Sequence, residues 1–349
     1  MRFGFWLPMF GGWLRNLDAE GMPATWEYVS RLARRAEEIG FDLTLLAELN
    51  LNDIKGPEAP SLDAWSTAAA LAAVTKRLEL MVAVRPTFHQ PALLAKQAAN
   101  IDHISGGRLS LNVVSSWWAT EARKYGVQFD EHDDRYARTG EWLSVVDGMW
   151  KEPVFTYKGK YYQVEEAILE PKPVQRPRPT IYAGGESPAG KDLIARSADA
   201  WLTHGDPPEL IGPKVAEMAA RREALDLPPM SYGAAGYVVV RNTPEAARSE
   251  VERITDVQQS ARGFANYRDW TENTRLERRM SLQDYSVSNR GLRSGLVGTP
   301  DQVADRILEF EACGLDLLLL QFSPQLEEME RFAEEVIPLV RERSSEEVA

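Results

Sequence analysis

Short apolar runs alternate with amphipathic helical stretches along the whole chain, and this alternation restricts the fold more than any other feature. The runs that predict β-strands cover 3–8, 42–48, 78–84, 108–114, 180–185, 200–205, 233–240 and 315–322. Helical patterns lie near 24–40, 61–75, 91–105, 134–150, 188–197, 207–225, 243–257 and 299–313, with a last helix near 325–342. Several of these strands are almost continuously apolar, which is typical of parallel strands covered on both faces. Eight βα alternations favour an α/β fold that closes into a (β/α)8 TIM barrel over an open sheet.

Two glycines and the surplus length refine this prediction. In EEIGFD and EACGLD, Gly40 and Gly314 stand where a helix should end in left-handed geometry before a strand begins. A minimal barrel takes roughly 250 residues, so about 100 residues of this chain are surplus. We expect one barrel domain over 1–343, with insertions near 49–60, 115–133, 152–178 and 258–296, and an acidic tail over 344–349. The long, polar insertion at 258–296 is typical of a mobile lid, and 152–178 suggests a small β excursion.

Composition argues against several classes of function. The formal net charge of −12 argues against binding to nucleic acid or to an anionic membrane surface. No apolar run approaches the roughly 20 residues that span a bilayer. The N-terminus shows no signal-peptide pattern, so we expect a cytoplasmic protein. The one cysteine, Cys313, excludes an internal disulfide and a cysteine-based metal cluster.

Motifs for metal, nucleophilic or dinucleotide chemistry are missing. The four histidines have neither HxH nor HExxH spacing, so we expect no catalytic metal. No GxSxG marks a nucleophilic serine. No GxGxxG follows the first predicted strand, so the dinucleotide-binding fingerprint is also absent.

In a barrel of this type the active site lies at the carboxyl ends of the strands. The residues at those positions are mostly aromatic, with few charges, and no lysine suited to a Schiff base stands among them. They are Phe10, Trp13, Glu48, Asn50, Arg85, Thr87, Phe88, His89, Ser115, Ser116, Trp117, Trp118, Gly184, Gly185, Ser187, His204, Phe322 and Ser323, with Tyr237 within its strand. We therefore expect a dry, aromatic site with a few hydrogen-bonding groups.

The run NVVSSWW ends the fourth predicted strand with two adjacent tryptophans. Neighbouring side chains of a strand point to opposite faces, so Trp117 and Trp118 cannot both enter one core if the strand continues through them. We expect one of them to line the site and the other to pack beneath the insertion. The alternative is that both are purely structural.

Two further segments suggest polar contacts to a ligand. In GGESPAGKDL, paired glycines follow a strand and open a helix, which suits one phosphate, although a plain strand-to-helix turn has the same pattern. In DEHDDRYART, His132 and Tyr136 stand four residues apart on one helical face. They either contact a polar ligand or form a surface pair.

These segments, in their order and spacing, resemble the bacterial luciferase-like flavin monooxygenases, and within them the alkanesulfonate and dimethylsulfone monooxygenase group. The segments that carry the resemblance are AVRPTFHQPALLAKQAANIDHISGGRLSLNVVSSWW, EHDDRYART, YAGGESPAG, WLTHGDPPEL and LVGTPDQVADRI. The resemblance implies reduced FMN as cofactor, O2 as co-substrate, a separate NAD(P)H:flavin reductase as partner, and a homodimer or homotetramer. The flavin pocket that it implies consists of Val84, Arg85, Asn112, Ser115, Ser116, His132, Tyr136, Gly184, Gly185 and Ser187.

The chain departs from the alkanesulfonate enzymes at positions that bear on the substrate. Their Arg-x-His on the seventh strand is Ala235-Gly236-Tyr237 here, their tryptophan on the sixth strand is His204, and a tyrosine near the last helix is Ser323. Many relatives carry two serines after the paired glycines. The first is Glu186 here, and we expect its carboxylate to point away from a phosphate.

Because a preformed cationic clamp is largely missing, a neutral sulfone is favoured over a sulfonate, unless arginines of the lid hold the sulfonate. The expected reaction inserts oxygen next to sulfur and cleaves the C–S bond. We assign catalytic roles to Trp117, His204, Tyr237 and Arg290, and substrate contacts to Phe10, Glu48, Asn50, Trp118, Arg293 and Ser323. The alternatives are a deazaflavin (F420)-dependent hydride transfer, oxygenation of a small molecule without sulfur, and flavin binding without turnover.

Overall fold

The computed structural model describes residues 1–257, 264–273, 281–287 and 292–347. Eight parallel strands close into a barrel in the order β1-β12-β9-β8-β7-β4-β3-β2, and β1 pairs with both β12 and β2. These strands are β1 (Arg2–Trp6), β2 (Leu43–Leu46), β3 (Glu79–Val84), β4 (Leu109–Val114), β7 (Thr180–Gly184), β8 (Ala200–Thr203), β9 (Ser231–Tyr237) and β12 (Leu317–Gln321). The predicted (β/α)8 barrel is confirmed.

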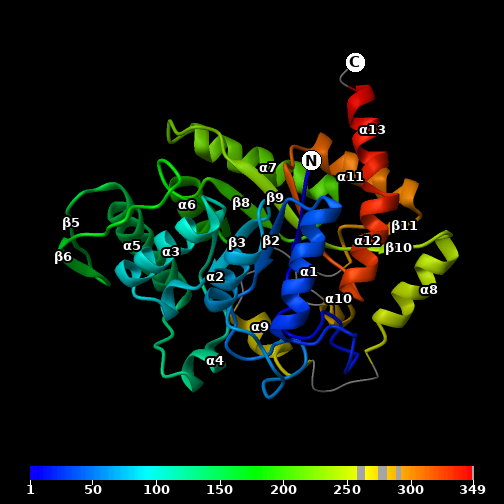
Figure 1. Ribbon diagram of the computed structural model, residues 1–349, viewed down its shortest axis with the longest axis horizontal. Helices are drawn as coiled ribbons and strands as arrows, with labels where there is room; N and C mark the ends of the chain where they lie inside the picture. The colour runs from blue at the N-terminus through cyan, green and yellow to red at the C-terminus, as the bar shows by residue number, and fades with distance from the viewer. Residues whose placement is uncertain (258–263, 274–280, 288–291, 348–349) are drawn as a thin grey trace.

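Helices that follow the strands cover the outside of the barrel (Figure 1). They are α1 (Trp26–Ile39), α2 (Ala64–Val74), α3 (Pro91–Ser105), α5 (His132–Lys151), α6 (Pro188–Ser197), α7 (Pro208–Glu223), α8 (Pro244–Ile254), α11 (Pro300–Ala312), α12 (Gln325–Glu335) and α13 (Ile337–Glu347), with a 3-10 turn, η1 (Pro86–Phe88). Gly40 ends α1 with a φ of 97°, and Gly314 follows α11 with a φ of 94°, so both glycines take the predicted left-handed geometry.

One predicted strand was too long. The predicted strand 233–240 ends at Tyr237, and β10 (Val239–Val240) pairs instead with β11 (Val297–Gly298) in a separate two-stranded sheet. In the segment expected to be an acidic tail, residues 344–347 belong to α13, which continues to Glu347. Ser344, on this helix, donates a hydrogen bond to Glu311 at 2.8 Å. This contact ties the end of the chain to α11.

The insertions carry short elements of their own. The segment 115–133 contains α4 (Ala119–Lys124), 152–178 contains the antiparallel strands β5 (Phe155–Lys158) and β6 (Gln163–Ala167), and 258–296 contains α9 (Tyr267–Asn273) and α10 (Leu282–Ser286). In Figure 1, α4 and α9 lie at the lower end of the barrel and the N-terminus lies at the opposite end. The expected β excursion at 152–178 is confirmed, whereas the predicted lid falls partly outside the described residues.

A polar cluster fills the barrel interior at its amino end. The guanidinium of Arg2 lies 2.6 Å from Glu79 and donates to the Tyr182 hydroxyl at 3.2 Å. Ser110 donates to the other oxygen of Glu79 at 2.6 Å. Burial raises the pKa of Tyr182 to about 12. These four side chains come from β1, β3, β4 and β7, so they tie the strands together at this end.

The alternation of side chains places a different set in the interior near the carboxyl end. Every second side chain of a strand points to the same face, so Ala83 points inward like Glu79, and Asn112 points inward like Ser110. The register between neighbouring strands also places Ala235 of β9 and Gln321 of β12 on the inner face. Alanine at two of these positions occupies little of the interior space, and the other two positions carry amides. The interior at this end therefore carries both small and polar side chains.

Candidate active site

Arg85, which follows β3, lies in a buried network of charges at the carboxyl ends of β2, β3 and β4. Its guanidinium donates to both carboxylate oxygens of Glu121, on α4, and lies 4.0 Å from the centre of the Phe88 ring. Its backbone N–H donates to one oxygen of Glu48 at 2.8 Å, and His89 forms a hydrogen bond with the other oxygen. The side chains of Arg85 and Glu48, predicted for flavin and substrate, are therefore engaged by other protein groups.

Glu121 is a member of this network that sequence reasoning missed. Its side chain is fully buried, and one of its oxygens accepts hydrogen bonds from the backbone N–H groups of Asn50 and Leu51, at 2.5 and 3.3 Å. It thereby fixes the loop after β2, where Asn50 was predicted to contact substrate. A single acidic residue in a short inserted helix belongs to no repeating pattern that would mark it as buried or functional. Only its place three residues after Trp118 could have suggested a role at the site.

The end of β4 presents buried polar atoms without partners. Within the described residues, Asn112 Oδ1 and Ser116 Oγ are buried and accept or donate no hydrogen bond. Ser115, in contrast, donates to Thr139 on α5 at 2.9 Å. The side chain of Val84, in the neighbouring strand β3, points outward because that of Ala83 points inward. The backbone of Val84 therefore borders the interior, and its side chain does not. A buried polar atom without a partner costs free energy, which makes this strand end a good candidate for ligand contact.

Trp117 and Trp118 stack on each other instead of pointing to opposite faces. Their ring centres are 5.4 Å apart and their planes differ by 6°. This is possible because β4 ends at Val114, so strand geometry does not extend through the pair. Trp118 is 1% exposed, and its indole N–H has no hydrogen-bond partner among the described residues. Trp117 packs against Trp270 and Tyr285, so the pair joins the strand end to α9 and α10.

The paired glycines after β7 lie against α5. A Cβ atom added at Gly185 would lie 3.0 Å from the Tyr136 hydroxyl, so no larger residue fits there without movement. Ser187 caps α6 by accepting from the backbone of Gly190 at 3.2 Å. Burial raises the pKa of Tyr136, while a hydrogen bond with the Ser187 side chain opposes that rise. The ring of His132 lies 5.1 Å from that of Tyr136. The fold thus brings together side chains that the sequence placed 50 residues apart.

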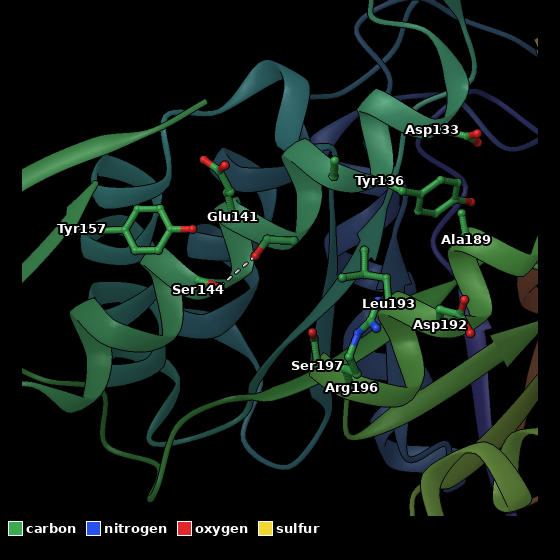
Figure 2. Close-up of a pocket in the computed structure, with 12 residues that line it drawn as sticks. Asp133, Tyr136, Glu141, Ser144, Tyr157, Ala189, Asp192, Leu193, Arg196 and Ser197 are labelled. Carbon is green, nitrogen blue, oxygen red and sulfur yellow. Dashed lines mark hydrogen bonds between the residues drawn. The ribbon is translucent and has the colours of Figure 1, made fainter. Parts of the chain in front are cut away.

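Tyr136 also borders a surface groove between α5 and α6, of about 520 Å³ (Figure 2). Leu193, Asp192 and Arg196 of α6 line one side of the groove, and Glu141 of α5 lines the other. Tyr136 therefore lies between the glycine turn after Gly184 and the outer surface of the barrel.

Glu186 is engaged by groups of β8 and α7. Its carboxylate accepts from the Thr203 hydroxyl at 2.7 Å and from the His204 backbone at 3.2 Å, and it lies 3.1 Å from His204 Nδ1. Lys214 lies 3.3 Å away. Burial alone would raise the pKa of Glu186, but His204, Lys214 and Thr203 hold it well below its usual range. The carboxylate is ionised and satisfied by these donors.

Tyr237 and Ser323 belong to a second buried chain of hydrogen bonds. Burial raises the pKa of Tyr237 well above its usual range, and a hydrogen bond with Ser323 opposes that rise. Ser323 in turn donates to Glu20 at 2.5 Å, and Glu20 pairs with Lys55. Phe10, in the same loop as Glu20, is 3% exposed. Glu20 and Lys55 were not among the predicted residues, because they lie in loops without a recognisable pattern.

Three of the arginines described at this end of the barrel, Arg15, Arg85 and Arg293, are paired with carboxylates. Arg293 lies 2.7 Å from Asp206, and Arg15, fully buried, pairs with Asp53. Arg290, predicted to be catalytic, falls outside the described residues. In the described part of the chain, no three His, Cys, Asp or Glu side chains are grouped to hold a metal ion. The described helices include none that is long and apolar enough to cross a membrane.

Comparison with known proteins gives consistent results. The family model of the luciferase-like monooxygenases matches residues 1–317. An FMNH2-dependent dimethylsulfone monooxygenase of Pseudomonas putida is 33% identical over 362 residues, covering 99% of this chain and 97% of the relative. Its counterpart in Pseudomonas fluorescens (strain Pf0-1) is 32% identical, covering 98% and 95%. The crystal structure of a long-chain alkane monooxygenase superimposes with a TM-score of 0.85 at 22% identity, covering 99% of this chain and 92% of that one, which supports the fold alone.

Proposed function

Because the chain belongs to the luciferase-like monooxygenase family, we propose that it is an FMNH2-dependent monooxygenase of small sulfones. The balanced reaction is RCH2–SO2–R′ + FMNH2 + O2 → RCHO + R′SO2H + FMN + H2O. One oxygen atom is inserted at the carbon next to sulfur, the C–S bond breaks, and the other oxygen atom leaves as water. The names of the two Pseudomonas relatives support both the cofactor and the substrate class.

The residue types at the carboxyl end of the barrel suit the polar edge and the phosphate of FMN. Asn112 Oδ1 and Ser116 Oγ are buried and unsatisfied among the described residues, as expected of groups that contact the polar edge of a flavin. Gly185, Ser187 and Tyr136 form a narrow turn at the start of α6 that suits the phosphate. Reduced FMN, when bound, supplies the electrons that activate O2. Gly184, Ser115 and His132 complete the proposed pocket, with Val84 contributing its backbone.

Arg85 takes a different role from the one first assigned to it. Its guanidinium is committed to Glu121, and the loop after β2 is held by the same carboxylate. We propose that Arg85, Glu48 and Glu121 position the walls of the cavity and do not bind the flavin phosphate themselves. Asn50 then reaches the substrate from a fixed loop.

The main observation that favours a neutral substrate is that three arginines at this end are paired with carboxylates. Arg85, Arg293 and Arg15 each lie against a carboxylate, so none of them offers a free charge to a sulfonate. A neutral sulfone needs no counter-charge and accepts only hydrogen bonds. We propose that His204 and Tyr237 supply polar contacts to it, while Phe10, Trp117 and Trp118 exclude water. Ser323 holds Tyr237, and Arg290 acts from the insertion.

The partners follow from the cofactor. A protein that uses FMNH2 as a substrate depends on a separate NAD(P)H:flavin reductase, and we propose such a partner here. We also propose a homodimer or homotetramer, in line with the resemblance.

A substrate screen tests this proposal. The protein is incubated with a general flavin reductase, NADH, FMN and air, together with dimethyl sulfone, methanesulfonate or an alkane, and products are identified by mass spectrometry. We expect sulfinate and aldehyde from the sulfone. Turnover of the sulfonate alone would move the assignment to the alkanesulfonate class. Tight binding of a reduced deazaflavin instead of FMNH2 would overturn the monooxygenase assignment.

A further inference from the structure

Two residues at which this chain departs from the pattern that the family resemblance leads us to expect contact each other. Glu186 stands in place of a serine and His204 in place of a tryptophan, and Glu186 Oε1 lies 3.1 Å from His204 Nδ1. The same oxygen accepts from the backbone N–H of His204 at 3.2 Å. One carboxylate oxygen of Glu186 therefore contacts both the backbone N–H and the ring of His204.

The hydrogen bonds of Glu186 determine which nitrogen of His204 carries a proton. An ionised carboxylate only accepts hydrogen bonds, so Nδ1 of His204 must be the donor. Nε2 is then the acceptor in the neutral ring and a second donor in the imidazolium. Among the described residues Nε2 has no hydrogen-bond partner, and the side chain is 28% exposed. Nε2 is thus the atom available to a ligand.

The charged groups around this pair are balanced. Lys214, on α7, lies 3.3 Å from Glu186 and 3.0 Å from Asp206, and Arg293 lies 2.7 Å from Asp206. Two carboxylates thus face two cations, and His204 is the remaining titratable group. Arg293 belongs to the insertion 258–296, so this chain of ion pairs runs from the insertion to the imidazole.

We propose that Glu186 is a positioning residue that fixes His204 with its proton on Nδ1, so that Nε2–H of the imidazolium donates to a sulfonyl oxygen of the substrate. This proposal rests on the proposed sulfone monooxygenase function. A sulfonyl oxygen only accepts hydrogen bonds, so the neutral ring, whose Nε2 only accepts, cannot bind it. Because only the imidazolium donates from Nε2, we expect substrate binding to weaken as pH rises.

Nuclear magnetic resonance of the histidine-labelled full chain tests the orientation without turnover. Nitrogen–proton correlation spectra identify the protonated ring nitrogen, and H204Q assigns the signal. We expect the Nδ1–H form in the neutral ring of the wild type. In E186Q we expect the Nε2–H form to gain population, because the charged acceptor that holds the proton on Nδ1 is lost. An Nε2–H form in the wild type, or the same form in E186Q as in the wild type, overturns the proposal.

Controls and kinetics separate this inference from the proposed function. E217Q removes a carboxylate from the same helix that bears Lys214, where Glu217 pairs with Lys191, and should leave His204 unchanged. The signal of His103, on α3, should also stay constant in every variant.

With dimethyl sulfone as substrate, E186Q should raise KM about tenfold, which corresponds to a loss of about 1.4 kcal/mol, with kcat little changed. An unchanged KM would overturn the role of Glu186. Absence of sulfone turnover by the wild type would overturn the proposed function, while the spectra would still decide the orientation of His204.

Discussion

The two ends of the barrel treat buried polar groups in opposite ways. At the amino end, Arg2, Glu79, Ser110 and Tyr182 satisfy one another across four strands. At the carboxyl end, and within the described residues, Asn112 Oδ1 and Gln321 Oε1 lie in the same interior without any partner. A complete network stabilises the fold, whereas an incomplete one costs free energy that only a ligand can return. The contrast indicates that the amino end serves stability and the carboxyl end serves binding.

The carboxyl end is not uniform, however. Arg85, Glu121, Glu48 and His89 engage one another after β2 and β3, although Arg85 Nε has no hydrogen-bond partner among the described residues. A set of ion pairs therefore accompanies the unpaired hydrogen-bonding groups of β4 at this end. Four predictions test this division, in order of their expected effect on the free energy of unfolding.

The largest effect is expected for E121A. Removing this carboxylate leaves the Arg85 guanidinium buried without a counter-charge, which should lower the free energy of unfolding by about 3–5 kcal/mol. Urea unfolding followed by circular dichroism measures the change. E330A, which breaks the exposed pair of Arg35 and Glu330, is the matched control and should cost less than about 1 kcal/mol. Equal costs for the two variants would show that the buried network does not stabilise the rim.

A smaller loss is expected for E79A at the amino end. The buried Ser110 hydroxyl loses its acceptor, and Arg2, which is partly exposed, loses its counter-charge, so we expect a loss of about 1–3 kcal/mol. The value of kcat/KM at a temperature where the variant is folded should stay within about twofold of the wild type. A tenfold loss of kcat/KM would contradict the assignment of this end to stability.

The third prediction concerns pH. Burial would raise the pKa of Glu37, but the backbone N–H groups of Lys76, Arg77 and Leu78 hold it below its ordinary value. A carboxyl with a lowered pKa stabilises the folded protein above its unfolded pKa, about 4.3, and loses that contribution as pH falls through the folded pKa. Because Glu37 is partly exposed and its charge is screened, E37Q should cost less than about 1 kcal/mol at pH 7, and the cost should be smaller at pH 3. Urea midpoints at both pH values check this, and a pH-independent cost would refute it.

The smallest change in stability is expected for S116A. Because the Ser116 hydroxyl has no partner in the described part of the chain, its removal should change the free energy of unfolding by less than about 0.5 kcal/mol. The Kd of FMN, followed by fluorescence quenching, should nevertheless rise about tenfold, which corresponds to about 1.4 kcal/mol. S110A, at the other end of β4, is the matched control, with the opposite pattern of reduced stability and unchanged FMN affinity. A loss of stability without a loss of FMN affinity in S116A would contradict the proposal that the carboxyl end serves binding. A loss of FMN affinity without a loss of stability in S110A would contradict the proposal that the amino end serves stability.

Much of the fold could be predicted because it depends on local patterns. Continuous apolar runs and the left-handed glycines at 40 and 314 fix where strands and helices begin and end. The predicted strand 233–240 failed at its end because β10 pairs with β11, a partner about 60 residues away that no local pattern reveals. The sequence also predicted where a site should lie, since the strand ends of a barrel converge at one rim. It did not predict which of the residues at that rim pair with one another.

Arg85 and Glu186 illustrate this limit. In the sequence each is a charged residue close to a strand end. The resemblance assigned Arg85 to the flavin pocket, and the carboxylate of Glu186 was expected to point away from a phosphate. Only the folded chain shows that Arg85 is neutralised by Glu121, 36 residues away, and that Glu186 holds His204. Trp117 and Trp118 show the same limit, because the alternation rule failed as soon as the strand stopped.

The sequence by itself determined the closed parallel barrel, the end at which its polar site lies and the residue types found there. These follow from periodicity and chain direction, which are properties of neighbouring residues. The tertiary structure alone decided which charges are free and which are cancelled. That outcome depends on burial and on distances of 3–4 Å between groups far apart in the chain, where a low dielectric makes each pairing decisive.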